Sequence, residues 1–291
     1  MRFSVAPPAA VAACLCMAVA YVGVLYTLPR SIRRLPRDHR THILARFLLI
    51  CIVCALCPFL LAIFYEHDES NMSFAAWLGI REEGLLPAVV LPMLLTATLF
   101  TGSLLANALH LAHVSKQFHS RGVWLAVKNS ALYYSLTHDQ LPSLRNYILG
   151  PLTEEFVFRS CMIPLLVCAD FTVKQIILCS PLMFGVGFQL LYTSVFGAYA
   201  SFVYLRTGHF ASIVAVHVFC NVLGVPNVSF FNPENPLHPF RTVILGAYFV
   251  GIYGFTRLLV PWTEPSLYSS GLWNLTTPGG ENASESEQVG L

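Results

Sequence analysis

Two neighbouring carboxylates and an arginine open an apolar stretch in the middle of the sequence. Residues 153–160 read T-E-E-F-V-F-R-S and continue into C-M-I-P-L-L-V-C-A. On a helix, Glu155 and Arg159 are four residues apart with the glutamate first, which is the favourable order for an ion pair, while Glu154 points about 100° away. Charges in so apolar a stretch cost about 2.5 to 3.5 kcal/mol each on membrane-insertion scales, so they need partners or a function.

The same residues also allow a purely structural interpretation. Thr153 fits a helix N-cap, and both carboxylates would then lie in the first turn, where the helix dipole favours negative charge. In this interpretation the segment is an interfacial helix with an acidic first turn and one salt bridge between Glu155 and Arg159. Glu154 then has no chemical role.

A second polar pair lies in a later apolar stretch. In H-V-F-C-N, His217 and Asn221 are four residues apart and project from one face of the helix predicted at 209–225. Such side chains either aid helix packing or belong to a functional site. In a site, Glu154 would take a proton from water and pass it to a leaving amine, and His217 and Asn221 would donate hydrogen bonds to the oxyanion.

Together these groups predict amide hydrolysis without a covalent enzyme intermediate. The sequence contains neither G-x-S-x-G nor H-E-x-x-H, and no cysteine has a suitably placed base. Cys51, Cys54 and Cys57 recur at helical spacing without nearby histidines or carboxylates, so we interpret them as packing residues rather than as a metal site. A carrier that uses Glu154 and the histidines as a proton relay is a third possible function.

The composition is typical of a polytopic membrane protein. Of the 291 residues, 56% are hydrophobic and 11% are charged, whereas an ordinary soluble domain has about 25% charged residues. The net charge of +2 and the lack of a basic aromatic stripe argue against nucleic acid as a partner and leave the lipid bilayer. The cysteines all lie in apolar segments and predict no disulfide framework.

Apolar stretches of about 20 residues predict the helices that cross the membrane. The candidates are residues 9–28, 43–65, 85–112, 147–169, 209–225 and 240–261. The stretch from Gln175 to Leu205 has no charged residue or histidine and is too long for one crossing, so it predicts two passes that turn near Gly185 and Gly187. The expected fold is an all-α, polytopic transmembrane bundle of about eight helices.

Basic residues predict how this bundle is oriented. The loop after the first predicted helix contains Arg30, Arg33, Arg34, Arg37 and Arg40, and the loop after the third contains Lys116, Arg121, Lys128 and Arg145. The loop after the second helix is mostly acidic. The positive-inside rule therefore places the first and third loops in the cytosol, together with the end of the fourth segment that carries Glu154.

The chain divides into a membrane domain and a tail. Residues 1–262 form the predicted membrane domain, and residues 263–291 are polar, rich in Gly, Pro and Ser, and predicted to be disordered. Residues 1–28 also resemble a cleavable signal peptide. Their apolar run continues up to a heavily basic loop, which favours a retained helix.

Two motifs together resemble a known family. E-E-F-V-F-R at 154–159 is similar to the E-E-x-x-x-R signature of the type II CAAX prenyl endopeptidases, the Ras-converting enzymes of the endoplasmic reticulum. H-V-F-C-N at 217–221 is similar to their H-x-x-x-N signature, and F-G-A-Y-A-S-F-V-Y-L-R-T-G-H-F resembles the stretch before it. The resemblance is strongest over residues 140–226.

The resemblance implies a multi-pass protease of the endoplasmic reticulum membrane, with a catalytic cavity open to the cytosol. It would remove the last three residues from prenylated CAAX proteins, such as Ras-like small GTPases, without a metal or another cofactor. By position, Glu154 is implied to activate the water and His217 to take part in catalysis. Glu155 and Arg159 are implied to support Glu154, and His217 and Asn221 to form the oxyanion site.

One residue of the family pattern is missing. The family has an F-x-x-x-H histidine between the two signatures, but the matching stretch reads S-P-L-M-F-G-V-G-F-Q-L-L-Y and has Phe188 in that place. No histidine occurs between His138 and His209, and His209 belongs to the later R-T-G-H phrase. The sequence reads as though a segment were deleted at Gly187–Phe188. The alternative function is therefore a catalytically impaired member that binds prenylated tails or partners without cleaving them.

Overall fold

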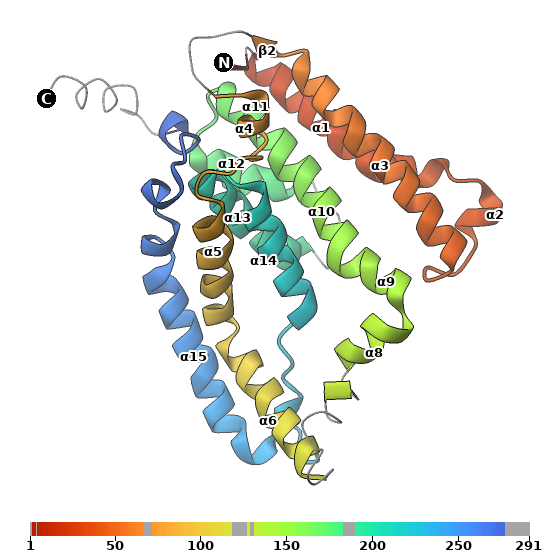
Figure 1. Ribbon diagram of the computed structural model, residues 1–291, viewed down its shortest axis with the longest axis vertical. Helices are drawn as coiled ribbons and strands as arrows, with labels where there is room; N and C mark the ends of the chain where they lie inside the picture. The colour runs from red at the N-terminus through yellow and green to blue at the C-terminus, as the bar shows by residue number, and fades with distance from the viewer. Residues whose placement is uncertain are drawn as a thin grey trace, which may run out of the picture.

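The computed structural model describes residues 2–3, 5–66, 72–117, 127–128, 131–182 and 190–276, and these residues form an assembly of helices (Figure 1). The α-helices are α1 (Pro7–Gly23), α2 (Arg30–Arg33), α3 (Arg40–Ala62), α4 (Phe74–Trp77), α5 (Leu85–Leu99), α6 (Thr101–Gln117), α8 (Ala131–His138), α9 (Gln140–Leu144), α10 (Gly150–Glu155), α11 (Met162–Cys168), α12 (Val173–Leu182), α13 (Leu190–Thr207), α14 (Phe210–Leu223) and α15 (Arg241–Leu258). Two short strands, β1 (Arg2–Phe3) and β2 (Tyr65–Glu66), pair antiparallel. The predicted all-α architecture is confirmed.

Several helices are suited to a membrane by length and composition. Pro7–Thr27 and Arg40–Ala62 are each long and apolar enough to cross one. Two further pairs qualify only together and are bent, by 74° between Leu85–Leu99 and Thr101–Lys116 and by 54° between His238–Leu258 and Pro261–Tyr268. The described residues therefore supply two to four crossings by these criteria, and the total of about eight stays a prediction.

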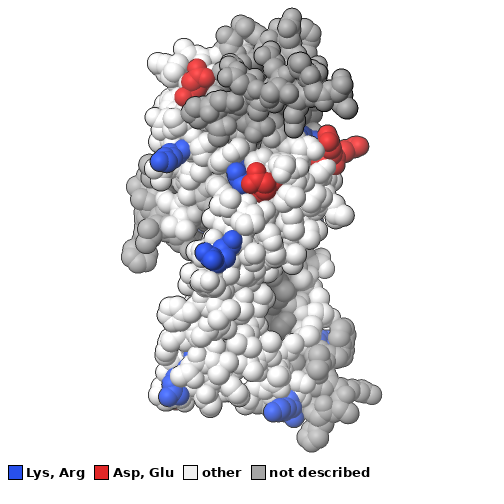
Figure 2. Space-filling view, turned by 90° about the vertical axis from the view of Figure 1, so that its left-hand side faces the viewer, with Lys and Arg blue, Asp and Glu red and all other residues white. Residues whose placement is uncertain are grey.

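Apolar side chains also cover the outer surface of the bundle. On α15, Val243, Phe249, Val250 and Tyr253 are 59%, 65%, 67% and 65% exposed. Figure 2 shows charged side chains in the upper half and at the lower edge of one face, with an uncharged band between them. So apolar an exterior is unfavourable in water and matches the hydrocarbon region of a bilayer.

The core is centred on α11, in which all seven residues are buried. The first helix, α1, packs against it and buries Cys14 and Met17 in the same cluster. This packing makes α1 part of the bundle, and its retention stays a prediction. Cys57 is buried in this core, Cys54 packs against it, and all nine cysteines are free thiols.

The stretch 85–112, predicted as one helix, consists of two. The chain bends by 74° between α5 and α6, and α6 then runs along α15. At Gly102 a Cβ atom would collide with the ring of Tyr248, and the Tyr248 hydroxyl lies 2.9 Å from the Ser103 hydroxyl. The prediction was wrong because apolar residues continue on both sides of the bend, so hydropathy does not mark its position.

The stretch Gln175–Leu205 contains two helices, α12 and α13, as expected, and the two membrane passes predicted for it stay a prediction. They pack side by side, with the hydroxyls of Ser180 and Ser201 3.0 Å apart. The predicted turn at Gly185 and Gly187, and Phe188 with it, lies outside the described residues.

The first half of the predicted tail differs from the disorder expected of it. Residues 263–276 form short 3₁₀ turns, and Thr263, Tyr268 and Leu272 are buried against the bundle. The stretch is polar on average, and this composition predicted disorder. Its few aromatic and apolar residues nevertheless pack against the bundle. Residues 277–291 lie outside the described part.

Candidate active site

One continuous helical segment carries the first motif. It runs from α9 through a π-helical turn at Arg145–Leu149 into α10, and through a second π-helical turn at Phe156–Cys161 into α11. The predicted N-cap at Thr153 is wrong, because its hydroxyl donates to the carbonyl of Leu149 at 2.7 Å within the helix. The two carboxylates therefore do not lie in a first turn, and the capped-helix interpretation fails.

The second π-helical turn begins directly after the two carboxylates. Such turns are rare and occur frequently at functional sites. The predicted ion pair is present, with Nη1 of Arg159 3.1 Å from Oε1 of Glu155. The side chains of Arg159 and Glu155 are only 5% and 0% exposed. A buried pair of this kind depends on both partners, because either charge alone would be left without compensation.

Helix α14 places His217 against both glutamates. Its Nδ1 lies 2.7 Å from Oε1 of Glu155, and its Nε2 lies 3.9 Å from Oε2 of Glu154. An ionised carboxylate can only accept a hydrogen bond, so we assign the proton to Nδ1, which donates it to Glu155. In the neutral ring, Nε2 then presents a lone pair toward Glu154. The ring of Phe196 packs on the imidazole, with the centroids 4.7 Å apart.

Glu154, in contrast to Glu155, has no structural partner. Its side chain is 30% exposed, and within the described residues it makes neither a hydrogen bond nor an ion pair shorter than the 3.9 Å approach to His217. That separation is too long for a direct hydrogen bond. It leaves room for a water within about 2.8 Å of both Oε2 of Glu154 and Nε2 of His217.

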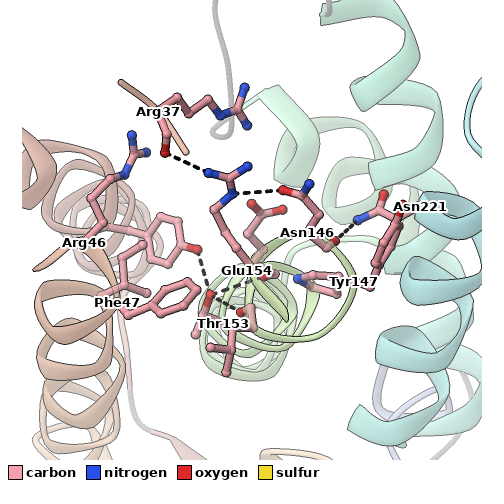
Figure 3. Close-up of a pocket in the computed structure, with 14 residues that line it drawn as sticks. Arg37, Arg46, Phe47, Asn146, Tyr147, Thr153, Glu154 and Asn221 are labelled. Carbon is pink, nitrogen blue, oxygen red and sulfur yellow. Dashed lines mark hydrogen bonds between the residues drawn. The ribbon is translucent and has the colours of Figure 1, made fainter. Parts of the chain in front are cut away.

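A cavity of about 470 Å³ opens beside Glu154. Figure 3 shows Glu154 between α3, which carries Arg46 and Phe47, and α14, which carries Asn221. The Asn221 amide donates one N–H to the carbonyl of Asn146 at 2.9 Å. Because a carboxamide has two N–H groups, its second one stays available to a ligand in the cavity.

The motifs did not indicate several other residues that line this cavity. Tyr21 of α1 lies 3.0 Å from the Thr153 hydroxyl, and Asn146 holds Asn221 by its carbonyl. No pattern in the sequence points to either residue. Three arginines also line the cavity: Arg37, Arg46 and Arg145. The sequence indicated such basic residues only as a guide to the orientation of the helices in the membrane.

Comparisons with known proteins bear on the family of this chain. Residues 137–223 match the model of the family described as Type II CAAX prenyl endopeptidase Rce1-like. CAAX prenyl protease 2 of Arabidopsis thaliana is 34% identical over 91% of this chain and 93% of its own length. CAAX prenyl protease 2 of Homo sapiens is 34% identical over 88% of this chain and 82% of its own length. The chain belongs to the type II CAAX prenyl endopeptidase family. No solved structure matches it.

The family match spans both motifs, from Glu154 to Asn221. The structure brings together the five predicted site residues of this endopeptidase family member: Glu154, Glu155, Arg159, His217 and Asn221. The ring of His209 lies elsewhere, with its Nε2 3.1 Å from Nη2 of Arg81. His209 therefore does not replace the histidine of the F-x-x-x-H pattern, as the sequence predicted.

The Arabidopsis thaliana relative contains residues without a counterpart in this endopeptidase family member. The alignment with the Arabidopsis thaliana protein covers 304 positions, whereas 91% of this chain corresponds to about 265 residues. The remaining positions fall opposite gaps in this chain.

Proposed function

We propose that this chain is a membrane endopeptidase that removes the C-terminal tripeptide from prenylated CAAX proteins by means of a water activated by Glu154. One observation carries the proposal: His217 is fixed by Glu155 at 2.7 Å and faces the partly exposed, unpaired Glu154 at 3.9 Å, beside a cavity. The substrate class comes from the relatives, which are named CAAX prenyl protease 2.

The reaction begins with a water bound between Glu154 and His217. Its hydrogens are donated to the Glu154 carboxylate and to Nε2 of the neutral His217 ring. Glu154 removes a proton as the water oxygen attacks the carbonyl carbon of the prenylated cysteine, and a tetrahedral oxyanion forms. Glu154 then passes the proton to the departing amine. The C–N bond breaks, which leaves a carboxylate on the prenylated cysteine and releases a free tripeptide.

Asn221 is the principal donor to the oxyanion in this mechanism. Asn221 lines the cavity, and its second amide N–H remains a donor in every protonation state of the site. With Nδ1 donating to Glu155, His217 can donate from Nε2 only when that nitrogen also carries a proton. Glu155 and Arg159 thus act as positioning residues: the arginine holds the carboxylate, and the carboxylate holds the imidazole.

The same proposal places the protein in the endoplasmic reticulum membrane with its cavity open to the cytosol. Arg37 of the first basic loop and Arg145 ahead of the motif both line the cavity, so it opens on the side that the positive-inside rule assigns to the cytosol. A prenyl chain buried in the bilayer contributes roughly 0.8 kcal/mol per carbon. Prenylated Ras-like GTPases would therefore approach along the membrane with their peptide at this face.

The alternative is a catalytically impaired family member that binds prenylated tails without cleaving them. The observation in its favour is Phe188, which stands where the family pattern has a histidine. In the proposed mechanism His217 alone shares the water with Glu154, so cleavage depends on whether one imidazole is sufficient.

The deciding experiment incubates membranes containing this chain with a farnesylated peptide that ends in C-a-a-X, alongside membranes containing Glu154→Gln. We expect the parent to release the tripeptide and the variant to release none. If the folded parent binds the peptide and releases nothing, the impaired binder is correct. If it neither binds nor cleaves, both functions are wrong and the proton-relay carrier remains.

A further inference from the structure

The cavity beside Glu154 is lined by more positive charge than the proposed chemistry requires. Three arginines line it together with Glu154, and they come from separate elements: Arg37 from the loop before α3, Arg46 from α3, and Arg145 from the π-helical turn before α10. None of them takes part in activating water. So dense a positive lining beside one partly exposed carboxylate matches an anionic ligand.

Two of these arginines are less suited than the third to bind such a ligand. Arg145 donates to the side chains of Asn146 and Asp38 at 2.9 Å each and to the carbonyl of Arg37 at 3.0 Å, so its guanidinium is engaged within the protein. The residue Arg37 is exposed to solvent, where an ion pair contributes little.

Arg46 combines partial burial with a lack of engagement. It is half-buried on α3, and in the described ranges its guanidinium makes no hydrogen bond or ion pair. Figure 3 shows it on one side of Glu154, with Asn221 on the other. A half-buried guanidinium that faces a cavity can form a bidentate pair with a carboxylate.

We infer that Arg46 binds the terminal carboxylate of the CAAX peptide and thereby sets which bond Glu154 attacks. The inference rests on the proposed function. A CAAX substrate ends in a free carboxylate three residues beyond the scissile bond, and three extended residues span about 10 Å. With the carboxylate held at Arg46 and the scissile carbonyl held at Asn221, the peptide crosses the cavity past Glu154. Two such fixed contacts would select release of a tripeptide over release of a shorter or longer fragment.

The test measures binding, which does not depend on cleavage. A fluorescent farnesylated C-a-a-X peptide is titrated as the free acid and as the C-terminal amide into the parent, Arg46→Ala, Arg46→Lys and Arg40→Ala, all as full chains in membranes. Arg40 is the matched control, since it begins the same helix and is exposed without lining the cavity. Tripeptide release from both peptides is measured in parallel.

We expect the parent and Arg40→Ala to bind the acid about 10-fold more tightly than the amide, as for the loss of one charge-assisted pair. Arg46→Ala should bind both equally, and Arg46→Lys should recover part of the preference. Equal binding by the parent, or an unchanged preference in Arg46→Ala, would overturn the inference. A preserved acid preference without tripeptide release would contradict the proposed hydrolysis while leaving the Arg46 site intact.

Discussion

The protein contains two charge clusters that differ in whether a charged group faces a cavity. The site cluster consists of Glu154, Glu155, Arg159 and His217. The anchor cluster surrounds Arg81, whose guanidinium contacts Nε2 of His209 and donates to the carbonyls of Tyr268 and Ser269. Both join segments far apart in the sequence. Only the site cluster leaves a carboxylate that faces a cavity and lacks a partner in the described structure.

The anchor cluster uses its charge to hold the fold, whereas the site cluster also has charge that is available for chemistry. In the anchor cluster, the arginine donors are directed at backbone carbonyls of the C-terminal segment, and removing them should affect that segment alone. In the site cluster, Arg159 donates one hydrogen bond to Oε1 of the buried Glu155, while Glu154 is partly exposed beside the cavity and one edge of His217 is directed toward it. Substitutions in the two clusters should therefore separate activity from stability.

The largest effect is expected on activity from Glu154→Gln. The amide cannot accept the proton of the attacking water, so tripeptide release should fall by about 10²- to 10⁴-fold or more. Stability should change by less than about 0.5 kcal/mol, because Glu154 makes no structural contact. Cleavage rate and thermal unfolding of the same membrane preparation test both parts. A variant that keeps its rate, or that unfolds like a core mutant, would remove Glu154 from the catalytic role.

The next largest effect is expected on stability from Glu155→Ala. This substitution strands the buried Arg159 and removes the acceptor of Nδ1 in His217. Breaking one side of a buried ion pair costs about 3 to 5 kcal/mol, which is more than Glu154→Ala should cost. Thermal unfolding in detergent compares the two variants.

Equal losses of folded protein for Glu155→Ala and Glu154→Ala would contradict the assignment of one carboxylate to structure and the other to chemistry. Glu155→Gln sharpens the comparison. It keeps a hydrogen-bond acceptor for His217 but not the charge that Arg159 requires, so it should be intermediate in stability.

A smaller and local effect is expected from Arg81→Ala in the anchor cluster. The variant loses its bonds to the carbonyls of Tyr268 and Ser269 and leaves His209 with one partner fewer, at a cost of about 1 to 3 kcal/mol. Limited proteolysis should then cut within residues 263–276, while tripeptide release persists. Arg257→Ala is the matched control, since Arg257 is exposed on α15 and, within the described residues, its guanidinium lies over the ring of Tyr253 without an ion pair. If Arg81→Ala instead loses activity without faster proteolysis, the two clusters are not independent.

The sequence predicted the helical architecture well because apolar runs dominate it, and it failed where a local feature overrides hydropathy. The bend between α5 and α6 lies within one predicted apolar stretch, and Gly102 beside it packs closely against Tyr248 of α15, far along the chain. Residues 263–276 are also held by two arginines from other parts of the chain. Arg81 donates to a backbone carbonyl of this segment, and Arg206 donates to a backbone carbonyl and to a carboxylate.

The site was predictable as a set of residues, but its geometry was not. Spacing alone predicted the pair of Glu155 with Arg159 and the shared face of His217 and Asn221. It could not predict that His217 would contact Glu155 more closely than Glu154, since this depends on the π-helical turn and on the docking of α14. Thr153 was assigned as a cap because the sequence does not reveal that the helix begins upstream, at Gln140.

The smallest effect is expected from metal removal, which tests whether the site cluster acts through its own side chains. Nδ1 of His217 is engaged with Glu155, and Oε1 of Glu155 with Arg159, so two of the nearest ligand-type atoms already have partners. Within the described residues, no group of three His, Cys, Asp or Glu side chains has the arrangement that a metal ion needs. Chelators should therefore leave tripeptide release unchanged, as measured on the farnesylated peptide. An inhibition that zinc reverses would mean that Glu154 and His217 are metal ligands, and the division between structural and chemical carboxylates would have to be redrawn around that ion.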